Sequence, residues 1–529
     1  MNSFPRPFAR GIAALAIAAP WLNPLASGPA PATQQTMVTL ASAAVLLLLL
    51  ALRQLAGNEL ARAVAWGWLM AALVSSVIGL LQYFGVSDMV SPLVNFVGPG
   101  EAFANLRQRN QFATLTNIGL AVLLWWVAQE PTASATGRSP AHVPAALGWA
   151  MAALLALGNA TTSSRTGAAQ LLFLGLGAGI WTYLDRATVV KTRQPRPWQL
   201  LLFAAVIYGV AALWLLPWLA GLDAMTQGAL GHFIQGNTAC GGRRSLWSNV
   251  LYLIAQRPWL GWGWGELSYA HYITLYPGER FCDILDNAHD LPLHLAVELG
   301  VPIAVLLCGS ALLLGVRARP WCERDPARRM AWGVLAMIVV HSIVEYPLWY
   351  GPFLMAAVLC LVFLGRPRFR PDVVNATDDR PVRGPIVAVA GAFAVLVFTA
   401  YMAWDYHRVS QIFLSPSDRS PAYREDTLAK VQGSWLFRNH VRYAELTTTT
   451  VTRSNADEMH ALALQLLHFS PEARVLEKLI ESATLLGLDD EALFHMQRFR
   501  AAYAEEYAQW LKTGAQDAEP AGEEMDAPR

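Results

Sequence analysis

The residues best suited to chemistry lie in a polar stretch, residues 236–300, between two strongly apolar runs. His289 comes just before the second run, which has Pro292 in its expected first turn. Proline is favoured in the first turn of a helix, so His289 is expected at a helix N-terminus. A neutral imidazole there can accept a proton, and we expect His289 to act as a general base. The alternative is a capping or structural histidine, which an isolated histidine more often is.

Two adjacent arginines, Arg243 and Arg244, begin a segment that predicts a helix. Apolar residues recur at helical spacing through residues 243–256, and Arg257-Pro258 ends the pattern. With one apolar face, this helix is expected to lie along a membrane surface. Guanidinium groups bind phosphate oxygens through two parallel hydrogen bonds. Arg243 and Arg244 are therefore placed at the start of this helix, with side chains of a type that can bind an anion.

Two further arginines lie beside polar residues at expected helix starts. Arg165 follows a run of hydroxyl side chains in a short turn with no acidic residue nearby, and Arg109 precedes Asn110 and Gln111. Donors at a helix start suit an anionic or sugar ligand. The alternatives are a lipid headgroup contact for Arg165 and a solvated helix cap for Arg109.

The composition shows what must position these residues. Of 529 residues, 54% are hydrophobic and 15% are charged, and the mean hydropathy is +0.33, which excludes an ordinary soluble protein. The sequence predicts an all-α, polytopic membrane protein with about eleven spans, each roughly 20 residues long. The expected spans are residues 11–28, 36–52, 63–85, 110–128, 145–160, 166–184, 199–220, 291–316, 331–346, 350–364 and 386–406. The first could instead be a signal peptide, but Pro20 and Trp21 stand where a cleavage site should be.

Basic residues set the expected orientation. They cluster in alternate loops, at residues 53–62, 138, 186–196, 317–329 and 366–383, which the positive-inside rule places in the cytoplasm. Residues 221–290 and the C-terminal region then face outward. Cys240 and Cys282 both lie in this outward loop, where an oxidising compartment would favour a disulfide. Two unpaired thiols are the alternative.

The C-terminal region predicts soluble helical hairpins. Pro471 is expected to start a helix, Gly487 to end it, and Glu491 to begin its antiparallel partner, much as in tetratricopeptide-type repeats. We expect five regions in all. They are an N-terminal transmembrane bundle (1–220), an outward loop (221–290), further transmembrane helices (291–406), a helical domain (407–512) and a disordered tail (513–529).

Several motifs together resemble a known superfamily. The first set is Arg243-x-x-x-Trp247, Arg257-Pro258-x-x-Gly261-x-Gly263, Asn287-Ala288-His289-Asp290 and Ala296-x-Glu298-x-Gly300. It resembles the shared core of bacterial O-antigen ligases and Wzy-type polymerases. A second set, Arg109-Asn110-Gln111 and His341-Ser342-x-x-Glu345-Tyr346-Pro347-Leu348-Trp349-Tyr350, is more like PglL-type protein O-oligosaccharyltransferases. The resemblance spans nearly the whole chain.

The resemblance implies a GT-C-like membrane fold and transfer of a glycan from an undecaprenyl-diphosphate carrier at the periplasmic face of the inner membrane. His289 matches the family's essential histidine, and Arg165 and Arg243 match arginines that hold the diphosphate. The family commonly has His-Asn where this chain has His289-Asp290, which puts the orientation of the base in doubt. Asn287, Asp290 and Glu345 are further candidates for contacts with the sugar or the acceptor.

No Asp-x-Asp pair occurs in the outward loops, so the transfer is expected to need no metal or other cofactor, with arginines neutralising the leaving group. The expected acceptor is a pilin-like or other periplasmic protein. Lipid A core and a growing O-unit chain are the alternatives, and membrane lipids, but no nucleic acid, are expected partners. A transporter of a lipid-linked or anionic substrate is the competing class. Two observations count against it: the arginines gather at one face, and the chain shows no clear inverted repeat of the kind common in transporters.

Overall fold

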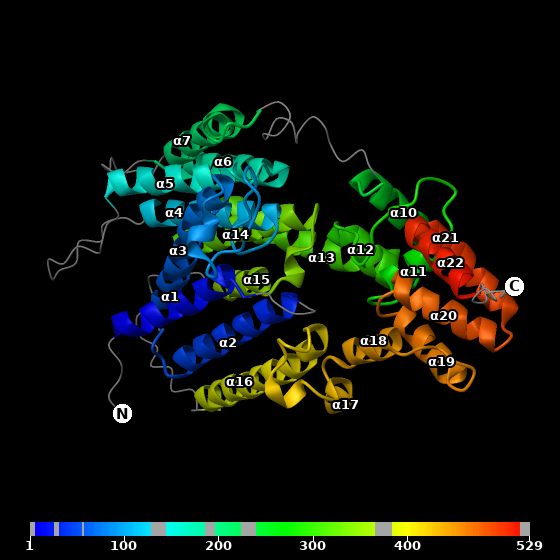
Figure 1. Ribbon diagram of the computed structural model, residues 1–529. Coiled ribbons are helices and arrows are strands. Elements are labelled where there is room, and N and C mark those ends of the chain that lie inside the picture. Colours follow the sequence, from blue (N-terminus) through cyan, green and yellow to red (C-terminus); the bar gives the residue numbers. More distant parts are fainter. Residues whose placement is uncertain are drawn as a thin grey trace, which may run out of the picture. The chain divides into compact units, whose positions relative to one another are not determined.

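A computed structural model describes residues 6–25, 31–55, 58–128, 144–185, 196–223, 240–365 and 383–518 (Figure 1). Every regular element in these ranges is a helix, so the predicted all-α class is confirmed. The basic residues expected in loops at 138, 186–195 and 366–382 lie outside the described residues, as do residues 224–239 of the outward loop and 519–529 of the tail.

The first compact unit comprises Met1–Gly236, His289–Leu291 and Ala311–Ala403. Its helices begin with α1 (Arg6–Leu22), α2 (Pro31–Ala51), α3 (Glu59–Tyr83), α4 (Arg109–Ala128), α5 (Ala145–Ala160) and α6 (Arg165–Asp185). They continue with α7 (Pro197–Val210), which runs on through a π-helical turn (Ala211–Leu215) into α8 (Leu216–Leu219). Later in the chain come α14 (Pro326–Ser342), α15 (Gly351–Gly365) and most of α16 (Arg383–Ser410), with short 3₁₀ turns at Ser87–Val90, Pro320–Cys322 and Pro347–Trp349.

All eleven expected apolar runs overlap helices. Among the described residues, seven helices are long and apolar enough to cross a membrane, and the shorter helices Pro7–Leu22, Ala145–Ala160 and Gly351–Gly365 are also apolar. A membrane protein with several spans is therefore well supported. The count of eleven stays a prediction.

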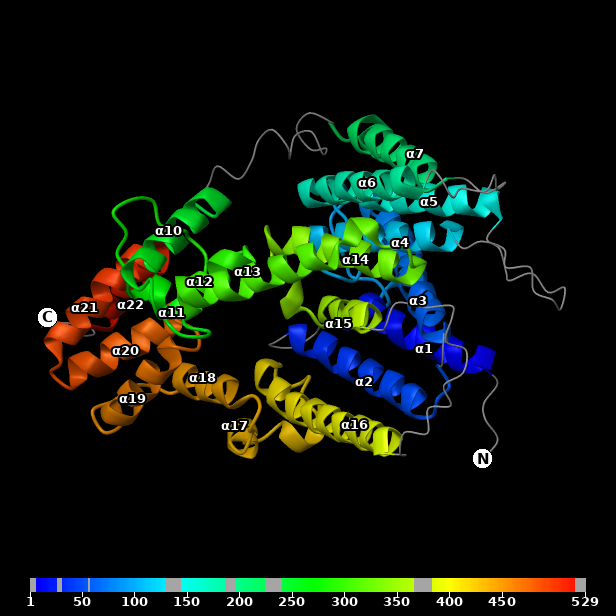
Figure 2. The ribbon, with the colours of Figure 1, turned by 180° about the vertical axis from the view of Figure 1, so that it is seen from behind.

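Small residues let the helices of the first unit approach closely. α3, α4 and α5 lie next to one another, and α14 lies against both α4 and α6 (Figure 2). Gly158 of α5 faces Ser76 of α3, and a Cβ on that glycine would be 2.3 Å from the serine Oγ. Such contacts are typical of membrane helix packing, where close backbone approach replaces the hydrophobic effect. Trp21 of α1 is fully buried and makes an edge contact with Phe353, so α1 is part of this core.

An ion pair lies at the start of α14. The Arg328 Nε donates to Glu323 Oε2 over 2.8 Å, and the Glu323 side chain is 4% exposed. The guanidinium group also donates to the carbonyl of Leu364 at the end of α15. This pair joins the last turn of one helix to the first turn of another.

The second compact unit comprises Asn237–Ala288, Pro292–Ser310 and Trp404–Arg529, so the outward loop and the C-terminal helices fall within one unit. Its helices are α10 (Arg243–Gln256), α11 (Leu267–Ile273), α12 (Leu291–Leu299), the start of α13 (Val301–Ala318), α17 (Thr427–Val431), α18 (Arg438–Thr448), α19 (Ala456–Leu467), α20 (Ala473–Leu485), α21 (Asp489–Ala502) and α22 (Ala504–Ala518). α22 continues past Thr513, where a disordered tail was expected to begin.

The hairpin expected in the C-terminal region is present. α20 ends at Leu485, Gly487 takes a φ of +73° in the turn, and α21 packs back against α20. The left-handed backbone at this position favours glycine. Leu476, Leu479 and Phe499 are fully buried between these helices.

The expected single helix over residues 291–316 is wrong, because the chain breaks at Gly300 between α12 and α13. Backbone groups of residues 258–263 fill this break. Trp262 N donates to Val297 O and Gly263 N to Glu298 O, both over 2.9 Å, and Val301 N donates to Pro258 O over 2.8 Å. A Cβ on Gly300 would lie 2.2 Å from the Trp259 carbonyl oxygen. We call this paired segment, residues 258–263 with 297–301, the backbone clasp.

Candidate active site

The imidazole of His289 is held by a carboxylate. His289 Nδ1 and Glu345 Oε2 are 2.6 Å apart, and the two side chains are 29% and 11% exposed, respectively. His289 has a φ of +50°, a strained conformation that non-glycine residues seldom adopt and that tends to persist at functional sites. The fold thus aims this ring at a buried acid while leaving part of it accessible.

The carboxylate is positioned in turn by two polar side chains. Asn110 Nδ2, in the first turn of α4, donates to Glu345 Oε1 over 3.1 Å. Ser164 Oγ donates to Asn110 Oδ1 over 2.6 Å and accepts the backbone N–H of Gly167 over 3.0 Å. Since Ser164 immediately precedes Arg165, this hydrogen-bonded chain runs from the imidazole to the start of α6. We call these side chains, His289, Glu345, Asn110 and Ser164, the polar relay.

Aromatic rings complete the setting of the imidazole. The Tyr346 ring meets the His289 ring edge-on, with centroids 4.8 Å apart, and stacks against Tyr350 at 5.7 Å. If Nδ1–H donates to Glu345, the lone pair is on Nε2, which is then the nitrogen that can take a proton. The arrangement suits proton removal from a hydroxyl group, with the carboxylate fixing the tautomer and stabilising the imidazolium as it forms.

A second polar layer lies beneath the relay, deeper among the helices. Thr114 Oγ1 is 3.0 Å from His341 Nδ1, and Gln170 Nε2 donates to Thr114 Oγ1 and to the Met337 carbonyl, both over 2.8 Å. Asn117 donates to Gly167 O over 3.0 Å and accepts from Asn159 over 3.2 Å. These bonds join α4, α5, α6 and α14. The helices that carry the relay are thereby fixed in rotation about their axes.

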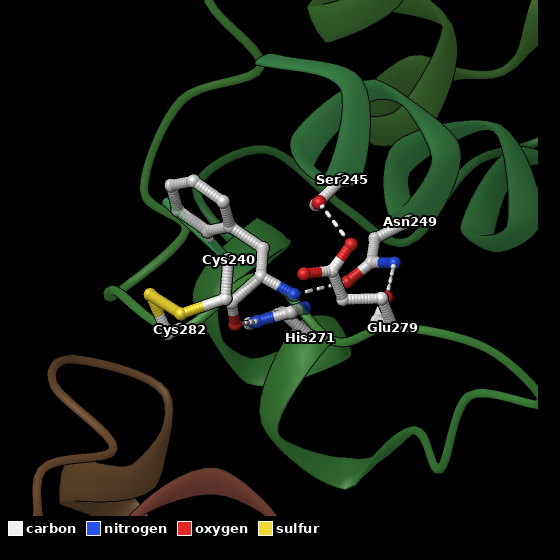
Figure 3. The surroundings of a disulfide bond; sticks show 7 residues. Cys240, Ser245, Asn249, His271, Glu279 and Cys282 are labelled. Carbon is white, nitrogen blue, oxygen red and sulfur yellow. Dashed lines mark hydrogen bonds between the residues drawn. A yellow bond between two sulfur atoms is a disulfide. The ribbon is translucent and has the colours of Figure 1, made fainter. Parts of the chain in front are cut away.

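Arg243 and Arg244 lie in the second unit, in the first turn of α10, and both are exposed. The neighbouring loop is fastened to this helix (Figure 3). Ser245 Oγ donates to Glu279 Oε2, Asn249 Nδ2 to Glu279 O and Phe281 N to Asn249 Oδ1, each over 2.9 Å. Cys240 and Cys282 form a disulfide with their Cα atoms 5.4 Å apart, the pairing expected from the sequence.

Three histidine or carboxyl groups of the second unit are structural. Burial and the nearby Arg280 charge lower the pKa of His271 to about 3, and its nitrogens lie 2.8 Å from the Tyr276 hydroxyl and 3.1 Å from Phe281 O. Glu298 is 1% exposed and accepts backbone N–H groups of Gly265 and Leu267. His294 Nε2 is 3.5 Å from Glu298 Oε2, and both side chains are buried.

α10 also fastens the chain next to the histidine. Trp247 Nε1, one turn along α10 from Arg243, donates over 3.0 Å to the carbonyl of Ala288. Ala288 directly precedes His289, and Asn287 beside it is 4% exposed. The helix that begins with the paired arginines is thus bonded to the segment that leads into the relay.

Three family models match the chain, each over a different part. Residues 102–127 match a protein glycosylation ligase model, residues 150–308 an O-antigen ligase model and residues 329–518 the C-terminal model of a virulence factor membrane-bound polymerase. The three ranges contain Asn110, His289 and Glu345, respectively. These matches support the O-antigen ligase superfamily, which the sequence motifs also resemble.

The chain is also similar to a curated protein. A general O-oligosaccharyltransferase from Acinetobacter baylyi is 24% identical over 347 residues, which is 64% of this chain and 55% of that protein. The chain therefore matches only about half the length of this relative. No solved structure matches this chain.

The structure brings together some of the site residues that the sequence suggested. Glu345 is in direct contact with both His289 and Asn110. Arg165 follows Ser164, the last residue of the relay. Arg109 is exposed at the start of α4, next to Asn110, and Asp290 is partly exposed beside His289. Gln111 is 1% exposed, so it has no accessible surface from which to contact an acceptor. One Glu345 oxygen lies against His289 and the other accepts from Asn110, which suits a positioning role; the expected contact of Glu345 with the sugar or the acceptor stays a prediction.

Sequence reasoning missed the side chains that support the relay. Ser164 was noticed only as a hydroxyl beside Arg165, and the layer formed by Thr114, Asn117 and Gln170 was not singled out. The available signal was the spacing of Asn110, Thr114 and Asn117, which places polar groups on one face of an otherwise apolar helix.

Proposed function

We propose that this protein transfers an oligosaccharide from an undecaprenyl-diphosphate carrier to a serine or threonine hydroxyl of a periplasmic protein. The observation that supports this best is the His289–Glu345 pair, 2.6 Å apart, at a strained and partly accessible position. Such a pair is suited to deprotonating an acceptor hydroxyl.

In the proposed reaction, His289 Nε2 takes the proton of the acceptor hydroxyl as its oxygen bonds to the anomeric carbon. The bond from that carbon to the carrier diphosphate breaks at the same time, and the configuration inverts. Negative charge grows on the leaving diphosphate, and guanidinium groups are the natural groups to neutralise it. We assign this role to Arg165 and Arg243, with Arg109 and Arg244 as supporting ligands. The imidazolium afterwards returns its proton to the leaving diphosphate or to solvent.

The choice of a protein acceptor is supported by two comparisons. The match to a protein glycosylation ligase model covers the start of α4, where Asn110 holds Glu345, and the curated relative is named as a general O-oligosaccharyltransferase. A second candidate is ligation of a glycan to lipid A core, because the O-antigen ligase model covers the segment that includes Arg243 and His289. Both candidates use the same chemistry and differ only in the acceptor.

We further propose that the relay faces the periplasm from the inner membrane. The disulfide between Cys240 and Cys282 supports this, since such bonds persist in oxidising compartments and are rare in the cytoplasm. The basic residues at 317–329, which include the Arg328 of the ion pair, would then lie on the cytoplasmic side.

The deciding experiment is a transfer assay with purified protein, lipid-linked oligosaccharide and an acceptor protein, read by intact mass. His289→Ala should lower the rate at least ~1,000-fold, whereas His407→Ala, at an exposed site in α16, should leave it unchanged. Arg243→Lys should lower the rate while retaining charge, because lysine lacks the planar fork. Activity should persist in EDTA.

Normal transfer by a folded His289→Ala protein would refute the assignment. Glycan found on lipid A core, with an unmodified protein acceptor, would select the ligase.

A further inference from the structure

A cavity of about 440 Å³ lies in the second unit, far along the chain from the relay. One side is the loop of residues 432–435 between α17 and α18, and the other is one face of α18. The side chains considered below are Gln432, Trp435, Arg438, Arg442 and Glu445. A volume of this size is within the roughly 300–1,000 Å³ of typical small-molecule sites.

The loop is held rigidly by a buried carboxylate. Asp405, in the last turns of α16, is 0% exposed and accepts from Ser434 Oγ over 2.9 Å and from Leu436 N over 3.1 Å. Arg408 donates to the other oxygen of Asp405 over 2.6 Å, and its guanidinium group lies over the Trp404 ring. Burying a carboxylate costs free energy unless it is fully bonded. Here the bonds it makes fix the turn that carries Trp435.

The rigid turn presents an indole outward. Trp435 is 62% exposed, although its neighbours Ser434 and Phe437 are 4% and 7% exposed. Its place in the cavity lining gives the site one flat apolar wall. An exposed indole on a fixed backbone is a surface on which the C–H face of a sugar ring can pack.

The polar groups opposite the indole lie on one helical face. Arg438, Arg442 and Glu445 are spaced by four and three residues, so their side chains line the same side of α18. In the part of the chain that the structure describes, neither arginine makes a hydrogen bond or ion pair. With Glu445 included, these three groups carry a net charge of +1.

We propose that this cavity binds an acidic oligosaccharide, a sugar chain that carries a carboxylate. The indole packs against a sugar ring, Gln432 and Glu445 accept hydrogen bonds from hydroxyls, and the arginines bind the carboxylate. Glu445 disfavours a doubly charged phosphate, so a singly charged sugar acid fits the charge better. The inference rests on the proposed function, since it names the class of glycan that the protein handles.

The test is direct binding, which does not depend on transfer. Full-length protein in detergent is screened by saturation-transfer NMR against trigalacturonate and sialyllactose, with maltotriose and lactose as neutral counterparts. The acidic sugars should bind and the neutral ones should not. Trp435→Ala should weaken binding at least tenfold, and the double variant Arg438→Gln/Arg442→Gln should abolish the preference for acid.

Matched controls separate this site from general effects. Trp259→Ala and Arg453→Gln, both at exposed positions of the second unit, should bind as the wild type does. His289→Ala should also bind normally, so loss of transfer and loss of binding are distinguished. The thermal unfolding midpoint of each variant confirms folding. Equal binding of neutral and acidic sugars, binding of neither, or unchanged binding by a folded Trp435→Ala protein would overturn the proposal.

Discussion

Replacing Glu345 by glutamine tests whether the carboxylate, rather than the histidine alone, makes the site competent. Glutamine has nearly the same shape and can still bond to Asn110, so the polar relay keeps its packing. It removes the charge 2.6 Å from His289 Nδ1. It can also turn its amide N–H₂ toward that nitrogen, which would place the ring proton on Nε2 and leave no base.

The magnitude follows from the geometry. Two unit charges about 4 Å apart interact by about 4 kcal/mol at an effective dielectric constant of about 20. Because the His289 side chain is 29% exposed, solvent screens part of this interaction. We therefore expect a loss of about 2–3 kcal/mol of transition-state stabilisation, or roughly 30- to 160-fold in kcat.

The assay is the transfer reaction under saturating lipid-linked donor, so that kcat and KM are separated. A positioning role predicts that kcat falls while KM for the donor stays unchanged, and that Glu345→Asp regains part of the rate. Glu323→Gln is the matched control, because it neutralises another buried carboxylate of the first unit, 4% exposed, that has no contact with the relay. A folded Glu345→Gln protein with kcat within threefold of wild type would refute the reasoning, and so would a loss confined to KM.

Two stability predictions concern the second unit. The pKa of His271 is lowered by burial and by Arg280 to about 3, so between pH 6.5 and 3 the unfolded chain binds a proton that the folded state excludes. The stabilisation from neutral His271 should be complete above about pH 6.5, and the free energy of unfolding should fall by about 2 kcal/mol by pH 5. His271→Gln should flatten this pH dependence in denaturant unfolding. A pH dependence that is the same with and without His271 would contradict the reasoning. Cys240→Ser/Cys282→Ser should cost about 3–4 kcal/mol and speed proteolysis of the loop, and an unchanged cleavage rate would show that the disulfide adds nothing.

Local patterns in the sequence predicted the helices well. The bounds of α10 agree with the apolar spacing of residues 243–256, and the turn at Gly487 follows from a glycine between two amphipathic segments. The break at Gly300 was missed because apolar residues continue on both sides, although Pro302 shortly after the glycine was a signal. An apolar run indicates how long a helix is and how exposed its residues are. It does not indicate that a second backbone segment fills a gap between two helices.

The site was only partly predictable for a different reason. The motifs identified His289, Asn110 and Glu345 as polar residues at helix ends, but not that they touch. His289 and Glu345 are 56 residues apart, and the contact depends on how α4, α6 and α14 pack. The positive φ of His289 is likewise imposed by tertiary structure, since nothing in the local sequence demands it.

If Arg243 holds the leaving diphosphate, as proposed above, the backbone clasp gives the lipid bilayer a way to affect the transfer rate. Trp262 belongs to the clasp, and its indole Nε1 donates to the Leu253 carbonyl of α10 over 3.0 Å. The start of α13 and the helix that begins with Arg243 are therefore coupled through hydrogen bonds. A bilayer whose thickness does not match a membrane helix makes that helix tilt. Tilting the start of α13 is expected to shift α10 and the Arg243 guanidinium group at its first turn. On the proposed role of Arg243, the transfer rate should then depend on acyl-chain length although no reacting group is altered.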